Sequence, residues 1–485
     1  MKKKNWKYLF SSILQAGLFL STLGVSAKDI YVNNLSGTDD NSGGKKREAF
    51  KTFQKAVSKA QPGDVIHLAN TNIPYKEMLF FSSRSGTENE RITVEGNGAV
   101  ISGSEPLDIP QWQEVSPGLY KNSVLYVQRR FNIDVVNRYF FLFDGKMNRM
   151  NRCLKGKNQP FKIPSTLNEN EWTFSGDDNS FYIKINPDKK LSDCNIEHPV
   201  RPTGVEIAGT SSYLTIKDLV CTHFYNDGFG ITNTANHLKF KNIKTLYCGD
   251  DGISAHAACQ YEVDGFVSIG NGTGICDTGN SMTSYNRVFI KDCVGVDLYY
   301  INEKPDGISK YTIRNSIIIC NAARPVVLIT EKPGAEMSVT MENVLVIGKM
   351  NSDADVRVAG KTKLLIRNCT FMNLDFIINA DSMSVQKSIL SGMKNVMTKY
   401  SQTIWNAKEN VYGLDHFNFN NKPYSIVNRT YEVYKSQSAD TLSVWVKEIS
   451  SRDLKKFEGN KIGANLSVLY SKKEMLNRYF REARN

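Results

Sequence analysis

The sequence lacks the marks of several common protein classes. Its nine cysteines form no CxxC motif, so a structural zinc site has no support. The LxxLxL pattern of leucine-rich repeats is missing. Basic residues cluster only at residues 45–47 and in the last segment, residues 472–484, which argues against nucleic acid as a partner.

Long apolar runs are also missing, apart from one near the start at residues 8–25. This run follows four lysines and contains Ser11, Gln15 and Ser21, so it is too short and polar for a membrane-spanning helix. It ends in "VSA" at residues 25–27, which completes the plan of a secretory signal peptide. We therefore predict a signal peptide at residues 1–27 and a secreted or periplasmic protein with no integral membrane segment.

The mature chain is basic and rich in unpaired cysteines. Its formal charge falls from +12 to +8 because the signal peptide holds four lysines and no acid. A basic secreted protein suits an anionic partner such as an acidic polysaccharide, although the charge could also serve solubility alone. Cys221 with Cys248, or Cys293 with Cys320, could form disulfides, but their spacing fits buried free thiols, which we favour.

An internal repeat decides the architecture. Short alternating segments recur at residues 214–219, 238–243, 261–266, 288–293, 311–316, 339–344 and 364–369. Each holds a turn residue, and a second short strand follows in nearly every unit. Asn and Asp tolerate the left-handed conformation of such a turn, and Asn amides can hydrogen-bond from coil to coil. The pattern predicts an all-β fold, a right-handed parallel β-helix. The turn residues are Asp218, Asn242, Gly265, Asp292, Asn315, Asn343 and Asn368.

The remaining segments predict covers for the solenoid. "AFKTFQKAVSKAQPGD" reads as an amphipathic capping helix within residues 28–106, which hold the N-terminal cap and first coils. Residues 107–203 interrupt the repeat and read as an inserted β subdomain. Residues 204–400 are the central coils that carry the site, and residues 401–485 are the C-terminal coils and cap, closing in a helix at residues 471–485. A solenoid capped at both ends is compatible with a monomer.

Several segments carry a family resemblance. "DIYVNNLSGTDDNSGG", "EWTFSGDDNSFYIKI", "NDGFGIT" and "GDDGISAH" resemble the cap, insert and coils of secreted bacterial β-helix proteins that act on polysaccharides. The resemblance covers residues 29 to about 383 and identifies the scaffold better than the substrate. It implies a polysaccharide lyase similar to the chondroitin sulfate and hyaluronan lyases of this architecture, which would cleave a uronic-acid-containing glycosaminoglycan by β-elimination.

The candidate site follows from stacking the second strands, which places Asp227 over Asp251. β-Elimination needs a cation for the uronate carboxylate, a base for the C5 proton and an acid for the leaving oxygen. Histidine titrates in a useful range, lysine and arginine supply charge, and only one of the neighbours Tyr299 and Tyr300 can face the groove. The candidate catalytic residues are His256, Lys304, Arg324, Tyr300 and Lys332. The candidate substrate-binding residues are Asp227, Asp250, Asp251, Asn302, Glu303 and Glu331.

Calcium is a possible cofactor, because carboxylate oxygens suit it. Asp250, Asp251 and Asp277 are the residues expected to hold it.

Two other functions stay open. A polygalacturonase-like hydrolase would use Asp227 with Asp250 and Asp251, although Thr273 stands where such enzymes carry a Gly-His-Gly histidine. An inverting hydrolase needs its carboxyls roughly 6.5 to 9.5 Å apart. The other open function is that of a glycan-binding β-helix protein without catalytic activity. The plainer interpretations are a solvated turn at the Asp pair and surface ion pairs at the two Glu-Lys-Pro repeats.

Overall fold

The computed structural model describes residues 27–156, 158–322, 324–349, 354–393, 397–414, 416–425, 430–446, 449 and 451–465. Residues 1–26 of the predicted signal peptide and the predicted helix at residues 471–485 lie outside this part. Within it, no helix has both the length and the apolar character needed to cross a membrane.

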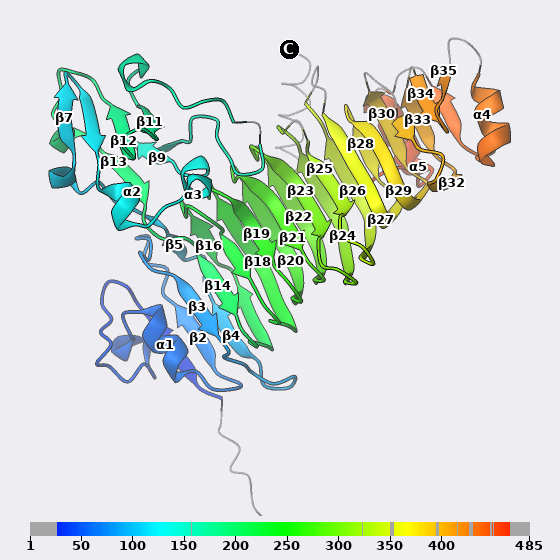
Figure 1. Ribbon diagram of the computed structural model, residues 1–485. Helices are drawn as coiled ribbons and strands as arrows, with labels where there is room; N and C mark the ends of the chain where they lie inside the picture. The colour runs from blue at the N-terminus through cyan, green and yellow to red at the C-terminus, as the bar shows by residue number, and fades with distance from the viewer. Residues whose placement is uncertain are drawn as a thin grey trace, which may run out of the picture.

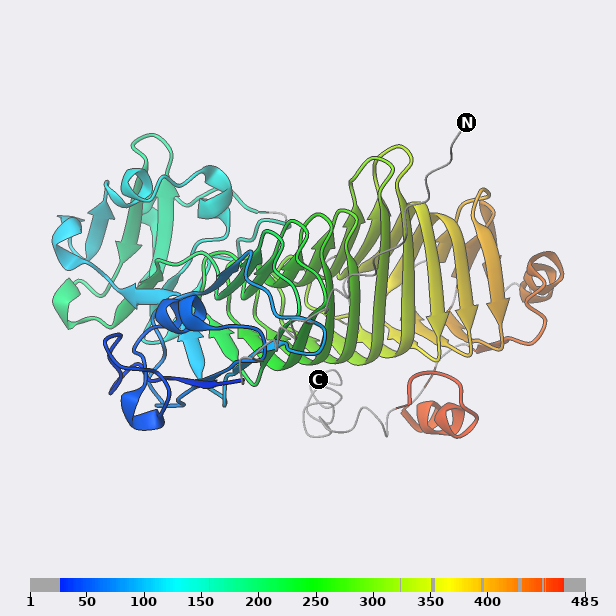
Figure 2. The same cartoon turned by 90° about the horizontal axis from the view of Figure 1, so that it is seen from below.

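The predicted parallel β-helix is confirmed, and its coils stack along one axis (Figures 1 and 2). Each coil contributes strands to three parallel ladders, here called A, B and C in chain order. Ladder A comprises β1 (Asp29–Val32), β2 (Val65–Leu68), β4 (Ile92–Glu95), β15 (Leu214–Lys217), the first parts of β18 (Leu238–Leu246), β20 (Gln260–Ile269), β22 (Met282–Lys291), β24 (Ile308–Ile319) and β26 (Glu336–Ile347), the second parts of β27 (Asp355–Arg367) and β29 (Asp375–Gln386), and β32 (Ile404–Lys408).

Ladders B and C complete each coil. Ladder B comprises β5 (Val100–Ser102), β16 (Val220–Thr222), the second parts of β18, β20, β22, β24 and β26, then β28 (Thr370–Met372), β30 (Ile389–Met393), β33 (Val411–Leu414) and β36 (Val444–Val446). Ladder C comprises β3 (Leu79–Ser82), β14 (Val205–Ala208), β17 (Phe229–Ile231), β19 (Asp251–Ala255), β21 (Thr273–Thr278), β23 (Val296–Asn302), β25 (Val326–Thr330), the first parts of β27 and β29, β31 (Met397–Lys399) and β34 (His416–Phe419).

The core is the interior of the solenoid. Alternate residues of each strand point inward and meet the equivalent residues of the next coil. In ladder C, Phe229, Ile253, Ile275, Leu298 and Val326 are consecutive partners, and all are fully buried. No coil could bury these side chains alone, so stacking supplies the stability. The cysteines are free, as expected, and all but Cys194 are buried.

Left-handed residues form the corner between ladders A and B, as the repeat predicts. Asn315 and Asn343 have φ angles of 49° and 54°, and the Asn343 side-chain amide donates to Asn315 Oδ1 at 2.8 Å. The Asn315 amide donates in turn to Asn286 Oδ1 at 2.8 Å. The prediction of Asp292 as this corner is wrong. Arg287 occupies it, because residues 288–291 already pair within ladder B.

The N-terminal cap contains the predicted helix, α1 (Phe53–Lys59). Thr52 Oγ1 accepts from the Lys55 N–H, which caps the helix. Phe53 and Ala56 join the solenoid core. A short 3-10 helix, η1 (Lys46–Glu48), precedes it.

The insert comprises two antiparallel sheets around an aromatic core of its own (Figure 1). One sheet contains β10 (Lys146–Asn148), β9 (Phe141–Phe143), β13 (Ile196–Pro199) and β6 (Ser104–Pro106), and the other contains β11 (Glu171–Ser175), β12 (Ser180–Lys184), β8 (Leu119–Asn122) and β7 (Gln113–Ser116). Its short helices are η2 (Ile109–Gln111), α2 (Leu125–Gln128), α3 (Ile133–Asn137), η3 (Pro164–Thr166) and η4 (Leu191–Asp193).

The last described coils carry β35 (Lys422–Ser425), which pairs antiparallel to β34, and two helices, α4 (Tyr431–Ser438) and α5 (Ser451–Gly459).

The asparagine corner generates a stability prediction. Asn315→Ala should lower the free energy of unfolding by about 3 to 4 kcal/mol, because alanine is strained by about 1 to 2 kcal/mol in this conformation and each of the two lost hydrogen bonds costs about 1 kcal/mol. Asn315→Gly loses the same hydrogen bonds without the strain and should cost less. Urea unfolding of both variants measures the difference, and an alanine variant as stable as the parent would contradict the account.

Candidate active site

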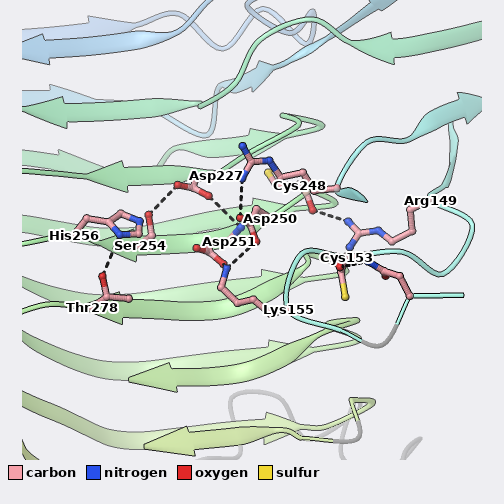
Figure 3. Close-up of polar contacts among 12 residues, drawn as sticks. Arg149, Cys153, Lys155, Asp227, Cys248, Asp250, Asp251, Ser254, His256 and Thr278 are labelled. Atoms are coloured by element: carbon pink, nitrogen blue, oxygen red, sulfur yellow. Dashed lines mark hydrogen bonds and ion pairs between the residues drawn. The ribbon is translucent and has the colours of Figure 1, made fainter. Parts of the chain in front are cut away.

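The site lies where ladder C begins, at the corner that follows ladder B. Phe229 pairs with Ile253, so the preceding residues Asp227 and Asp251 lie one above the other, as predicted. Asp227 Oδ1 accepts from the Asp251 N–H at 3.2 Å, and Asp227 Oδ2 accepts from Ser254 Oγ at 2.9 Å (Figure 3). Both carboxyl-bearing residues are almost fully buried, with exposed fractions of 4% and 2%. The stacked coils thus fix the two groups relative to each other.

Two cations from the insert reach this corner. Lys155, in the loop after β10, places Nζ 2.8 Å from Asp250 Oδ1 and 2.7 Å from Asp251 Oδ1 (Figure 3). Arg138, which follows α3, places Nη1 3.2 Å from Asp250 Oδ2. Three carboxylates therefore meet two cations, and the full ionisation of all five would leave one uncompensated negative charge. That imbalance favours the uptake of one proton or one cation.

A buried arginine anchors the loop that carries Lys155. Arg149 Nη2 donates to the Cys248 carbonyl oxygen at 2.6 Å, just before the acidic pair in the chain (Figure 3). Burial lowers the pKa of Arg149. The insert is thereby attached to the coil that supplies Asp250 and Asp251.

Environment separates the pKa values of the three acids. Burial and the neighbouring Asp250 raise the pKa of Asp251 to about 7, against the lowering effect of Lys155. Burial and Asp250 also raise the pKa of Asp227 to about 6. Burial alone would raise the pKa of Asp250, but Lys155 and Arg138 lower it below its ordinary value. Groups whose environments separate their pKa values in this way suit the roles of acid and base.

His256 completes the cluster at its exposed side. A carboxylate oxygen of Asp227, one of Asp251 and a ring nitrogen of His256 lie within 4.8 Å of one another, so the three could hold a metal ion. The two carboxylates offer the oxygens that calcium prefers, and the imidazole is a ligand typical of transition metals. His256 Nδ1 is 3.1 Å from Thr278 Oγ1, which orients the ring.

One of the three expected calcium ligands, Asp277, does not join Asp250 and Asp251. Asp277 points into the solenoid, where the hydroxyls of Tyr261, Tyr285 and Thr283 donate to it at 2.7, 2.9 and 2.6 Å. Alternate side chains of β21 point inward, and Asp277 lies two residues after Ile275, whose side chain is buried in the core. Asp277 therefore belongs to the core, and the prediction that it binds a metal with Asp250 and Asp251 is corrected.

Tyr300 is also buried, which corrects its place in the predicted site. Its ring stacks on Tyr311 with centroids 4.4 Å apart, inside the core. The neighbour with outward parity, Tyr299, is half-buried on the outer face, with Lys155 Nζ 5.9 Å from its ring centroid. Strand alternation correctly predicts that only one of the two faces outward, and that residue is Tyr299.

The remaining predicted residues lie on the same ladder but away from the acids. Glu303, Lys304, Glu331 and Lys332 are exposed in the loops that follow β23 and β25, at the far end of ladder C. Asn302 is fully buried, and its amide donates to the Gly307 and Glu336 carbonyl oxygens at 2.8 and 2.9 Å, so it shapes its loop.

Arg324 is exposed two residues before Val326, at the same corner as Asp251 and three coils further along. Coil spacing separates the backbones of Asp251 and Arg324 by about 14 Å. Arg324 can thus contact a long substrate but not the group that reacts at the acids.

Three residues of the site were missed from the sequence, namely Lys155, Arg138 and Ser254. The sequence could have revealed Ser254, because it lies three residues after Asp251 in β19, at a position whose side chain points outward. No sequence pattern reveals Lys155 and Arg138, because they come from irregular or short segments of the insert. They lie 96 and 112 residues before their partners Asp251 and Asp250.

Comparisons with known proteins give fold likenesses only. No family model matches the chain, and no curated protein matches it. Similar solved structures include a complex of XylC with xylose, 12% identical over 87% of this chain and 86% of that one, with a TM-score of 0.48. A glycoside hydrolase is 10% identical over 90% and 99%, with a TM-score of 0.49, and pectate lyase Pel9A is 12% identical over 80% and 80%, with a TM-score of 0.43. At these identities and TM-scores the likenesses say nothing about the activity of this chain.

Proposed function

We propose that this protein is a secreted enzyme that cleaves glycosidic bonds of an acidic polysaccharide at the Asp227–Asp251–His256 cluster. One observation carries the proposal: two buried carboxyls with raised pKa values lie together, beside a third that its cations keep ionised. Such a set can donate and accept protons near neutral pH. The basic mature chain supports an anionic substrate.

Acid–base hydrolysis is the reaction that these carboxyls support best. Asp251 has the higher pKa and holds the proton, so it protonates the leaving glycosidic oxygen. Asp227 has the lower pKa and acts as a carboxylate on the sugar carbon. Lys155 and Arg138 hold Asp250 ionised, and its negative charge keeps the proton on Asp251.

The separation of the acids favours retention of configuration. One oxygen of Asp227 and one of Asp251 are no more than 4.8 Å apart, and the carboxyls of a retaining pair are only roughly 5 to 5.5 Å apart. An inverting pair needs roughly 6.5 to 9.5 Å to admit a water molecule. In the retaining reaction Asp227 attacks the sugar carbon as Asp251 protonates the leaving oxygen, and Asp251 then takes the proton of the water that frees Asp227.

β-Elimination on a glycosaminoglycan, the reaction implied by the family resemblance, is the second candidate. The metal-holding geometry of Asp227, Asp251 and His256 favours it, because a bound cation would neutralise the uronate carboxylate. Lys155 and Arg138 are engaged with acids already, so further charge would come from Lys304, Lys332 and Arg324.

One assay tests the proposal and separates the two reactions. The mature protein is incubated with hyaluronan, chondroitin sulfates, pectate and alginate, each with and without a chelator. We expect new reducing ends without the ultraviolet absorbance of an unsaturated uronate. Proton NMR of the first product should show the same anomeric configuration as the glycosidic bond that was cleaved. Absorbance that a chelator abolishes would establish elimination instead, and no cleavage of any anionic polymer would contradict the proposed function.

Removing the acids should abolish turnover. Asp251→Asn and Asp227→Asn should each lower kcat by about 10² to 10⁴, the usual contribution of a positioned acid or base. Asp292→Asn is the matched control, because Asp292 is exposed at a corner outside the site and asparagine tolerates its left-handed backbone. Initial rates on the best polymer measure the effect. Near-normal activity of Asp251→Asn would overturn its role.

The pH profile should be bell-shaped. The kcat/KM should rise as pH increases through about 6, where Asp227 loses its proton, and fall as pH increases through about 7, where Asp251 loses its own. Lys155 lowers both pKa values, so Lys155→Met should move both limbs to higher pH, and Lys155→Arg should restore them. A Lys155→Met profile with unchanged limbs would show that Lys155 does not tune the acids.

A further inference from the structure

A second polar pocket lies on the outer face of ladder C, toward the N-terminal cap. Outward positions of β3, β14, β17 and β19 are in register as Phe80, Glu206, Gly230 and Ser254. Ser254 contacts Asp227, so this line of residues joins the acids to the first coil. Three coil steps place the backbone of Phe80 about 14 Å from that of Ser254.

The pocket, here called the Phe80 pocket, has a volume of about 700 Å³ and lies between α1 and the outer face of β3 and β14. That volume suits a small ligand or one part of a longer one. Its lining combines apolar and charged side chains of both signs, including Val57, Met78, Phe80, Arg84, Arg201 and Glu206.

Phe80 gives the pocket an exposed aromatic face. Its side chain is 48% exposed, although its neighbour Phe81 is completely buried in the core. The flat ring of an exposed aromatic side chain can pack against the apolar face of a sugar. Sugars also need polar partners, which the charged residues of the pocket provide.

The charges of the pocket favour an anionic ligand. Lys76 and Arg201 pair with Glu197 and Glu105 behind the pocket, at 3.4 and 2.5 Å. Arg84 has no carboxylate partner among the described residues; its side chain donates only to the Ser58 carbonyl oxygen, at 3.4 Å. A guanidinium in this state can bind a carboxylate or a sulfate through two hydrogen bonds.

The two acids of the pocket take up protons more readily than ordinary carboxyls do. Burial raises the pKa of Glu77 to about 7, and burial raises the pKa of Glu206 as well. Glu77 also accepts from the Phe53 N–H at the start of α1. The pocket therefore gains positive charge as the pH falls and Glu77 and Glu206 take up protons.

A glycine lies on the line between the pocket and the acids. A Cβ atom at Gly230 would lie 3.4 Å from Asp227 Oδ2 and 3.3 Å from Thr203 Cγ2. The absence of a side chain there means that no group on β17 separates Glu206 from Ser254 along this line. A chain lying along ladder C could contact both places at once.

We propose that the Phe80 pocket is a binding subsite for an anionic sugar of the same polysaccharide chain that is cleaved at Asp227 and Asp251. This inference rests on the proposed function and adds the place where the chain is held. Phe80 packs against the sugar ring, and Arg84 binds the sugar carboxylate or sulfate.

The test measures affinity against chain length in a protein that does not cleave its ligand. Hyaluronan and chondroitin sulfate oligosaccharides of increasing length are titrated by calorimetry into the Asp251→Asn protein, with and without Phe80→Ala or Arg84→Met. Each change should weaken the longer oligosaccharides about tenfold and the disaccharides much less. Ile308→Ala and Arg314→Met, at exposed positions of ladder A, serve as apolar and basic controls and should leave affinity unchanged.

The outcomes separate the subsite from the chemistry. An Arg84→Met loss on both polymers assigns the sugar carboxylate, and a loss on the sulfated polymer alone assigns the sulfate. Equal affinities of parent and Phe80→Ala protein at every length, or equal binding of a neutral oligosaccharide, would overturn the subsite. The proposed function is refuted if the parent protein, which keeps Asp251, cleaves none of the polymers. The subsite is retained in that case if the oligosaccharides still bind in a length-dependent way that needs Phe80.

Discussion

The register of the parallel coils is the constraint on which the rest of the structure depends. Equivalent residues of consecutive coils are held about 4.8 Å apart by the hydrogen bonds of each ladder. The fixed pairing of Phe229 with Ile253 places Asp227 over Asp251, and the pairing of Val205 with Phe229 extends the same line toward Phe80. Inward side chains prevent a slip, because a shift of one residue would turn the core outward. The geometry of the acids is therefore set by the packing of the interior.

Burial of three carboxyls at one corner creates an electrostatic cost that the insert offsets. Ionised groups without partners are expensive in a buried site, so Asp250 needs Lys155 and Arg138 to stay ionised. Two cations cannot neutralise three acids, so burial first, and then the charge of Asp250, raise the pKa values of Asp227 and Asp251. The insert thus does more than cover the coils, because the proton on Asp251 depends on the charges that the insert delivers.

The sequence predicts the parts of this site that repeat and misses the parts that do not. The solenoid, the capping helix and the stack of Asp227 on Asp251 all follow from periodic patterns within single coils. Alternation shows that Tyr299 and Tyr300 face opposite sides, but it does not say which one faces inward, and Asp277 fails for the same reason. Lys155 is invisible, since a lone lysine in an irregular loop carries no pattern and its partners lie far along the chain.

In the proposed function, binding and bond cleavage draw on different residues. The cations nearest the acids are consumed by ion pairs, so they have little capacity left for an anionic substrate. Two other cations lie along ladder C on either side of the acids, namely the half-buried Arg84 toward the cap and the exposed Arg324 three coils in the other direction. A polyanion spanning both would gain its affinity away from the acids and leave them free to exchange protons. A monosaccharide would reach neither flank, and so the arrangement favours a long anionic chain over a small sugar.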